Sequence, residues 1–272
     1  MAGEKYRTSS PGLDGNVNGN GNGNAAGTNG FQHNEDVARI PASRHDPRVV
    51  TVSQVPQPQF MKLANPGPLG LIGFALTTFV LGLYQCGVGL PDENPEGTVG
   101  PFQAVFGLAL FMGGLAQFVA GIMEFRVGNT FGTTVHCSYG AFWFSFAMFL
   151  IPGLGIEDAY KGDVHAYTFA IGIYLILWAF LTLIFLMAAL RTNWSIISVF
   201  FFLTLAFLFL SIAQFIETSH PKISINVNKT GGAFAVICAF CAFYAGSSGL
   251  MLEETTFIRL PLGAIPRGDR NV

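Results

Sequence analysis

The chain has 272 residues, of which 11% are charged and 51% are apolar, and its formal net charge is −2. An average soluble domain carries about 25% charged residues, so this composition excludes a soluble globular enzyme, a disordered protein and a disulfide-rich secreted domain. The 14 lysines and arginines are spread over the ends and the loops. They form no basic patch of the kind that nucleic acid requires, and no nucleic-acid partner is predicted.

The first 64 residues are polar, and between positions 15 and 30 they are almost entirely Gly and Asn. Such a composition cannot bury a core, so residues 1–64 are predicted to form a disordered cytoplasmic tail. The first long apolar run begins only at Leu69. This late start indicates that the first apolar segment is its own insertion signal, since no signal-peptide pattern precedes it.

Six windows without Asp, Glu, Lys or Arg follow the tail, each 21 to 25 residues long: 69–90, 101–123, 131–151, 166–190, 195–216 and 231–252. About 20 apolar residues suffice for a helix to cross a bilayer. The pattern predicts an all-α integral membrane protein with six transmembrane helices. The predicted transmembrane domain covers residues 65–253, and residues 254–272 form a cytoplasmic C-terminal tail.

The cations of the loops predict the orientation. Lys62, Arg126, Arg191 and the C-terminal arginines fall on one side of the expected topology, and three lysines fall on the other. Since Lys and Arg concentrate in cytoplasmic loops, both termini are predicted to be cytoplasmic.

No pattern in the sequence indicates catalysis, a metal site or a cofactor. The four cysteines, Cys86, Cys137, Cys238 and Cys241, all lie inside the charge-free windows, where they are expected to be small apolar residues rather than disulfide partners. We therefore predict that the protein is not an enzyme.

The polar residues inside the windows are almost all uncharged, and in a bilayer they are expected to face a cavity or to bond one another. The fourth window is the most apolar, and it is predicted to face lipid. Two ionisable residues stand out. His136 is either a hydrogen-bonded helix residue, the preferred interpretation, or a proton relay. Glu124 either pairs with Arg126 or Lys62, or lines the cytoplasmic mouth of a pore.

Residues 65–71, Asn-Pro-Gly-Pro-Leu-Gly-Leu, resemble the N-P-x-P-L-G-L signature of the acetate uptake transporter family, which includes bacterial succinate–acetate permeases and fungal acetate permeases. Family-like segments continue at 113–117, 128–132 and 138–143, and the Asn/Gly-rich tail resembles the fungal members. In the signature, Asn65 is a natural helix cap and Pro66 and Pro68 suit a first turn. The free N–H groups of that turn would favour a carboxylate.

The resemblance implies six helices around a pore in each subunit, assembly as a homo-hexamer, and an apolar constriction formed by Phe74, Tyr139 and Leu203. These residues lie eight or nine positions after the expected helix starts near 66, 130 and 194. At 1.5 Å per residue they share a depth of roughly 12–14 Å, close to the middle of a bilayer core.

The predicted function is transport of acetate and other short monocarboxylates across the plasma membrane by a multi-pass protein, with protons as the second partner. An apolar constriction disfavours a naked carboxylate far more than a neutral acid. The expected substrate-binding residues are Asn65, Thr77, Thr78, Gln117 and Thr204, and Glu124 and His136 are candidates for the pore mouth and for proton handling. The alternatives are a passive channel for acetate or ammonia, and a membrane sensor or regulatory protein that acts through the tail.

Overall fold

The computed structural model describes residues 63–97 and 99–266 of the chain. The predicted N-terminal tail, with Lys62, lies almost wholly outside these residues, and so do the last six residues of the predicted C-terminal tail. The described part is helical, with a single isolated bridge between Asn193 and Ala264. Its long helices are α1 (Gly67–Gln85), α4 (Thr130–Phe149), α5 (Val164–Ala189), α6 (Trp194–Ile216) and α7 (Pro221–Leu250).

One further helical segment lies between α1 and α4 and changes its geometry along its length. It passes from the 3-10 turns of η3 (Pro101–Val105) through α2 (Phe106–Leu108) and the π-helix η4 (Ala109–Ala116) to α3 (Gln117–Arg126). We call the whole segment the second span. π-Helical stretches are rare and are found mostly inside α-helices, frequently at functional sites.

Five helical segments of the described chain are long and apolar enough to cross a membrane, namely α1, the second span from Phe102 to Arg126, α5, α6 and α7. This confirms the prediction of a multi-pass, all-helical membrane protein. Helix α4 has 20 residues but is not in this set. Its first half carries threonines, a histidine, a serine and a tyrosine, which lower its mean hydropathy, so the sixth crossing stays a prediction.

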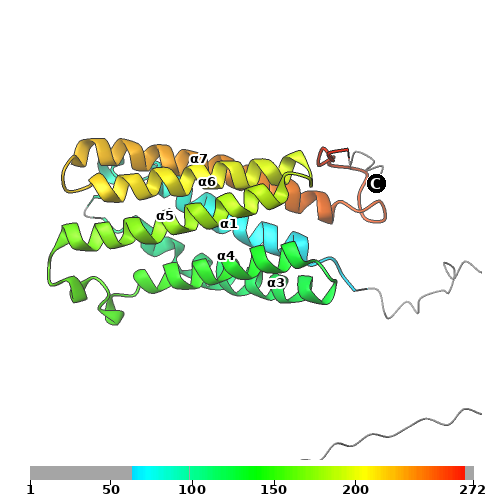
Figure 1. The fold of residues 1–272 in the computed structure, drawn as a ribbon, viewed down its shortest axis with the longest axis horizontal. Helices are drawn as coiled ribbons and strands as arrows, with labels where there is room; N and C mark the ends of the chain where they lie inside the picture. The colour runs from blue at the N-terminus through cyan, green and yellow to red at the C-terminus, as the bar shows by residue number, and fades with distance from the viewer. Residues whose placement is uncertain (1–62, 98, 267–272) are drawn as a thin grey trace, which may run out of the picture. The chain divides into compact units, whose positions relative to one another are not determined.

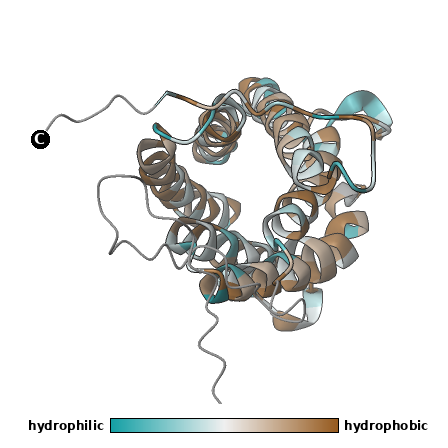
Figure 2. Ribbon diagram, turned by 90° about the vertical axis from the view of Figure 1, so that its right-hand side faces the viewer, coloured by the Kyte–Doolittle hydropathy of each residue, from teal (hydrophilic) through white to brown (hydrophobic). Residues whose placement is uncertain are grey.

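Successive helices run in opposite directions and form a bundle with two distinct ends (Figure 1). We call the end where α1 begins and α7 finishes the terminal end, and the opposite end the vestibule end. Seen along the bundle, the helices are arranged in a ring (Figure 2). Helix α1 packs on α7 and on the second span, and α6 packs between α5 and α7. Side-chain hydrogen bonds from Tyr139 to Thr182 and between Ser145 and Tyr174 link α4 to α5.

Short polar side chains fix where three of the helices begin. Asn129, Asp163 and Asn193 accept hydrogen bonds from the backbone N–H groups of the first turns of α4, α5 and α6 at 2.9 to 3.0 Å. Each satisfies a donor that a helix start leaves without an intrahelical partner. The starts of α4 and α6 therefore lie where the depth comparison of the three constriction residues assumed them.

After α7, the described part of the predicted C-terminal tail folds back along the terminal end. The backbone N–H of Trp194 donates to the Gly263 oxygen at 3.0 Å, and the Ser195 hydroxyl donates to the Leu262 oxygen at 3.1 Å. The Ser248 hydroxyl of α7 donates to the Leu260 oxygen at 2.6 Å. Residues 260–263 are thereby tied to the start of α6 and the end of α7.

Small residues allow the helix backbones to approach one another closely. A Cβ atom added at Gly232 of α7 would lie 2.8 Å from the backbone nitrogen of Cys86 and from the carbonyl carbon of Gln85, at the end of α1. Close packing of this kind holds membrane helices together where burial from water cannot.

We expect Gly232→Ala to destabilise the bundle by about 1–3 kcal/mol, the typical cost of overpacking, because backbone atoms cannot move aside as a flexible side chain can. Thermal unfolding in detergent measures the change. Gly107→Ala is the matched control: Gly107 also lies in a helix, and its added Cβ would meet nothing within 4 Å. An equal loss of stability in both variants would contradict the close approach of α7 to α1.

Candidate transport pathway

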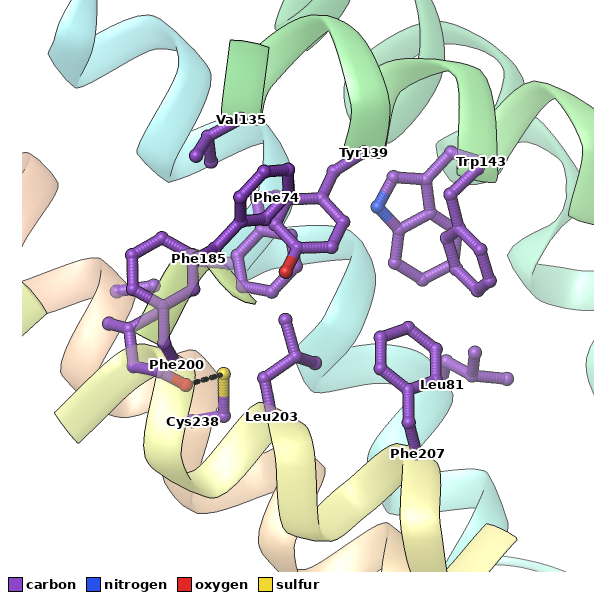
Figure 3. Packing of buried hydrophobic residues seen from close by; sticks show 14 of the residues in the cluster. Phe74, Leu81, Val135, Tyr139, Trp143, Phe185, Phe200, Leu203, Phe207 and Cys238 are labelled. Atoms are coloured by element: carbon purple, nitrogen blue, oxygen red, sulfur yellow. Dashed lines mark hydrogen bonds between the residues drawn. The ribbon is translucent and has the colours of Figure 1, made fainter. Parts of the chain in front are cut away.

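The three residues expected to form the constriction meet inside the bundle. Phe74 of α1, Tyr139 of α4 and Leu203 of α6 are 4%, 2% and 4% exposed. The ring centroids of Phe74 and Tyr139 are 5.6 Å apart. Leu203 points toward these two rings (Figure 3). The structure therefore brings together three side chains that lie far apart in the sequence, and we call them the apolar ring.

Tyr139 is held in place by residues of α5. Its hydroxyl donates to the Thr182 hydroxyl oxygen at 2.9 Å, and Thr182 in turn donates to the Trp178 backbone oxygen at 2.7 Å. The ring of Phe185 lies 5.7 Å from that of Tyr139. The expectation that the fourth window simply faces lipid is wrong for this face of the helix. A hydroxyl in an apolar helix needs a partner, and Thr182 finds it in the interior.

Two cavities lead from the vestibule end to the apolar ring. The wider cavity, the vestibule, has a volume of about 420 Å³, and its lining includes Gln85, Glu96, Glu217 and Asn228. The narrower cavity has about 40 Å³ and is almost wholly apolar; its lining includes Phe74 and Leu203. The two cavities share the lining residues Gln85, Phe146, Leu175 and Leu210, so the vestibule narrows into a dry passage that ends at the ring.

The five expected substrate-binding residues do not form one site. Thr78 lines the narrow cavity, whereas Thr77, Gln117 and Thr204 line neither cavity. The hydroxyls of Thr77 and Thr204 donate to backbone oxygens four residues earlier in their own helices, at 2.9 and 2.7 Å. Hydroxyls on helices commonly bond in this way, and their protons are therefore not free for a substrate.

Gln117 and Asn65 lie elsewhere. Gln117 is 1% exposed, and its side-chain oxygen has no hydrogen-bond partner among the described residues. Asn65 is exposed at the terminal end, where its side-chain oxygen accepts from the Gly67 N–H at 3.1 Å. This bond confirms that Asn65 caps the first turn of α1, as its position before two prolines predicts.

Glu124 also lies at the terminal end and is 3% exposed. Its carboxylate accepts from the Asn129 side-chain amide at 2.8 Å. The expected pairing with Arg126 is wrong, because the only ion pair in the described residues joins Arg259 to Glu253. Side chains two positions apart on a helix do not face each other, and Arg126 is exposed while Glu124 is buried. Lys62 lies outside the described residues.

Glu124 and His136 both contact the start of α1. A Cβ at Gly67 would lie 3.2 Å from a carboxylate oxygen of Glu124, and one at Gly70 would lie 2.5 Å from the His136 ring. His136 is 6% exposed, and its Nδ1 has no hydrogen-bond partner in the described chain, so the preferred interpretation of a hydrogen-bonded histidine is not met. The free first turn of α1, expected to favour a substrate carboxylate, lies against the carboxylate of Glu124.

Sequence reasoning missed two carboxylates that line the vestibule, Glu96 and Glu217. Burial raises the pKa of Glu96 to about 7, the nearby Glu217 carboxylate adds to this rise, and the Ser224 hydroxyl opposes it. Burial also raises the pKa of Glu217. Both residues stand in the sequence as ordinary loop charges beside apolar windows, and only the tertiary fold places them in one cavity.

The chain matches known proteins over most of its length. The model of the GPR1/FUN34/yaaH family matches residues 50–267. "Ammonia transport outward protein 2" of Saccharomyces cerevisiae is 39% identical over 77% of this chain and 69% of its own length. "Acetate permease A" of Emericella nidulans is 37% identical over 75% and 67%. "Succinate-acetate/proton symporter SatP" of Escherichia coli is 34% identical over 74% and 96%.

A solved structure shares the fold. It is titled "Structure of the bacterial acetate channel SatP" and superimposes with a TM-score of 0.58 at 30% sequence identity, covering 74% of this chain and 100% of that one. Family model, relatives and fold agree with the resemblance that residues 65–71 carry. The chain belongs to the GPR1/FUN34/yaaH family.

Proposed function

We propose that this protein transports acetate and other short monocarboxylates across a membrane together with protons. The observation that carries the proposal is the apolar ring of Phe74, Tyr139 and Leu203, reached from an open vestibule through a cavity of about 40 Å³. Such a passage admits only a small solute. The relatives named acetate permease and succinate-acetate/proton symporter make a short carboxylic acid the best candidate.

Coupling to protons follows from the chemistry of the ring. A carboxylate that enters an apolar passage loses its water without compensation, whereas the neutral acid loses far less. The described ring offers no cation to replace that water. The species that crosses is therefore the acid with its proton, and net movement follows the proton gradient.

The remaining features of the proposal concern topology and assembly. In it, α4 crosses the membrane as the sixth helix, both termini are cytoplasmic, and residues 1–64 form a cytoplasmic tail. The site of action is the plasma membrane, and six subunits assemble with a pore in each. Glu124 and His136 line the terminal mouth of the pore, next to the buried start of α1.

Purified protein in liposomes tests the coupling. With the membrane potential held at zero by potassium and valinomycin, a pH gradient is imposed and the accumulation of labelled acetate is measured. We expect acetate to accumulate against its own gradient on the alkaline side, faster than in protein-free liposomes, which report the leak of acetic acid through lipid. A passive anion channel would show no accumulation beyond that leak.

A passive channel for ammonia is the second candidate, and one relative is named for outward ammonia transport. The narrow apolar cavity suits a small neutral base as well as a small neutral acid. In the same liposomes, an outward ammonium gradient would then acidify the lumen faster with the protein than without it. Protein-dependent acidification without protein-dependent acetate uptake would favour this candidate.

A further inference from the structure

The floor of the vestibule holds a buried amide without a partner. Gln85 is 8% exposed and lines both the vestibule and the narrow cavity. Its side-chain oxygen has no hydrogen-bond partner among the described residues. Leaving a buried acceptor unpaired typically costs about 1–3 kcal/mol, so this position calls for a ligand that can donate a hydrogen bond.

Neighbouring residues hold the Gln85 backbone in place. The Asn228 side chain, 4% exposed, reaches the Gln85 backbone oxygen at 3.4 Å, and Gly232 packs against the same turn. The end of α1 is thus fixed against α7. The Gln85 amide presents one donor and one acceptor whichever way it is turned. A carboxylic acid presents the same pair in reverse, whereas a carboxylate presents acceptors only.

A pair of carboxylates lines the same cavity. Glu96, from the loop between α1 and the second span, and Glu217, directly after α6, act on each other electrostatically. One oxygen of Glu96 is buried and has no hydrogen-bond partner in the described chain. Since two nearby carboxylates resist being ionised together, the pair retains a proton at a pH where an isolated glutamate has lost it.

The other groups of the cavity do not supply a compensating positive charge. The titratable residues of its lining, from the loop between α4 and α5 and from α5 itself, are Glu157, Tyr167 and Tyr174. The α7 residues of that lining or beside Glu96 are the uncharged Asn228 and Ser224. The lysines of this end, Lys161, Lys222 and Lys229, form no ion pair in the described residues. The proton is therefore the charge that relieves the repulsion between the two glutamates.

We propose that the vestibule floor is a loading site for a short carboxylic acid, in which Gln85 binds the acid and Glu96, paired with Glu217, supplies its proton. An acetate ion that enters accepts a hydrogen bond from protonated Glu96. The Glu96 O–H bond breaks and a new O–H bond forms on acetate as the acid pairs with Gln85. The neutral acid passes into the narrow cavity, and the Glu96 carboxylate regains a proton from water in the vestibule.

This inference rests on the proposed function, and the test separates the two. Initial rates of acetate uptake are measured from pH 5.5 to 8.5 at a constant concentration of neutral acetic acid, so that the titration of the substrate does not enter. In the wild type we expect the rate to fall with a midpoint near 7, where Glu96 loses its proton. Glu217→Gln removes the repelling charge and is expected to move this midpoint down by about one pH unit.

Two further variants and one control complete the set. Glu96→Gln is expected to abolish the midpoint, and Gln85→Leu to raise the KM for acetate about tenfold, the worth of one or two hydrogen bonds. Glu157→Gln removes a charge from the exposed rim of the same cavity and is expected to keep the wild-type profile. A wild-type profile in Glu96→Gln, or an unmoved midpoint in Glu217→Gln, would overturn the loading site.

A readout without transport distinguishes failure of this site from failure of the proposed function. Infrared absorption of the protonated carboxyl group is followed during the same pH titration of the detergent-solubilised protein. The band is expected to disappear near pH 7 in the wild type and to be absent from Glu96→Gln. This result together with no protein-dependent acetate uptake would leave the protonated pair standing and reject acetate transport. Acetate uptake with no such band would reject the loading site alone.

Discussion

Leu203→Ala is expected to admit larger acids. Leu203 is 4% exposed, points at the rings of Phe74 and Tyr139, and lines the cavity of about 40 Å³ that precedes them. Removing most of its side chain widens that passage. We expect uptake of labelled lactate or succinate to rise at least fivefold, while acetate uptake changes less than twofold.

The variant should also cost stability, since a Leu→Ala change in a packed interior typically costs about 2–5 kcal/mol. Its thermal unfolding is therefore measured beside its transport. Leu177→Ala is the control: Leu177 lies on α5 and is 61% exposed, so neither substrate range nor stability should change. Unchanged uptake of lactate and succinate in a folded Leu203→Ala protein would remove the ring from its proposed role.

The second large effect is expected at Glu124, whose carboxylate accepts from the Asn129 amide while the Asn129 side-chain oxygen caps α4. Glu124→Leu leaves that amide without its partner in a buried place and loosens the turn between the second span and α4. A buried donor that loses its partner costs about 1–3 kcal/mol. We expect a clear fall in thermal stability and a loss of acetate uptake of tenfold or more.

Glu124→Gln separates the structural role of Glu124 from a role in proton handling. The glutamine oxygen can still accept from Asn129, so stability is expected to return to near the wild-type value. If acetate still accumulates under a pH gradient in this variant, Glu124 is a structural anchor of the terminal mouth. If the folded variant loses that accumulation, the carboxyl group itself takes part in moving the proton.

The charge-free windows located the membrane helices well, because the cost of placing charge in a bilayer is written locally in the sequence. The window 69–90 corresponds to α1, and 195–216 to α6. Helix caps are equally local, so Asn65 was identified before the fold was known. The third window was less clear, since α4 carries the polar residues that contribute Tyr139 to the ring, and hydropathy alone does not mark it as a span.

Partnerships across the fold were not readable in the same way. The sequence offered Arg126 as the partner of Glu124 because the two are close along the chain, but helical geometry turns them apart and the fold supplies Asn129 instead. Thr182 was noted only as a lone polar residue in an apolar helix, and its contact with Tyr139 spans 43 positions. Glu96 and Glu217 meet only because two loops close over one cavity, which no local pattern records.

The π-helix η4 in the second span sets how far this chain can change in length. Residues 109–116 contain roughly one residue more than an α-helix of the same extent would need. Deleting one residue there would let the segment relax to regular α-helix and turn everything after it by about 100° relative to what precedes it. Gln117 and Glu124, now buried, would then turn toward the outside of the bundle. The polar interior of the second span thus depends on a surplus residue, so a one-residue deletion harmless to the hydropathy profile should be among the least tolerated changes in the protein.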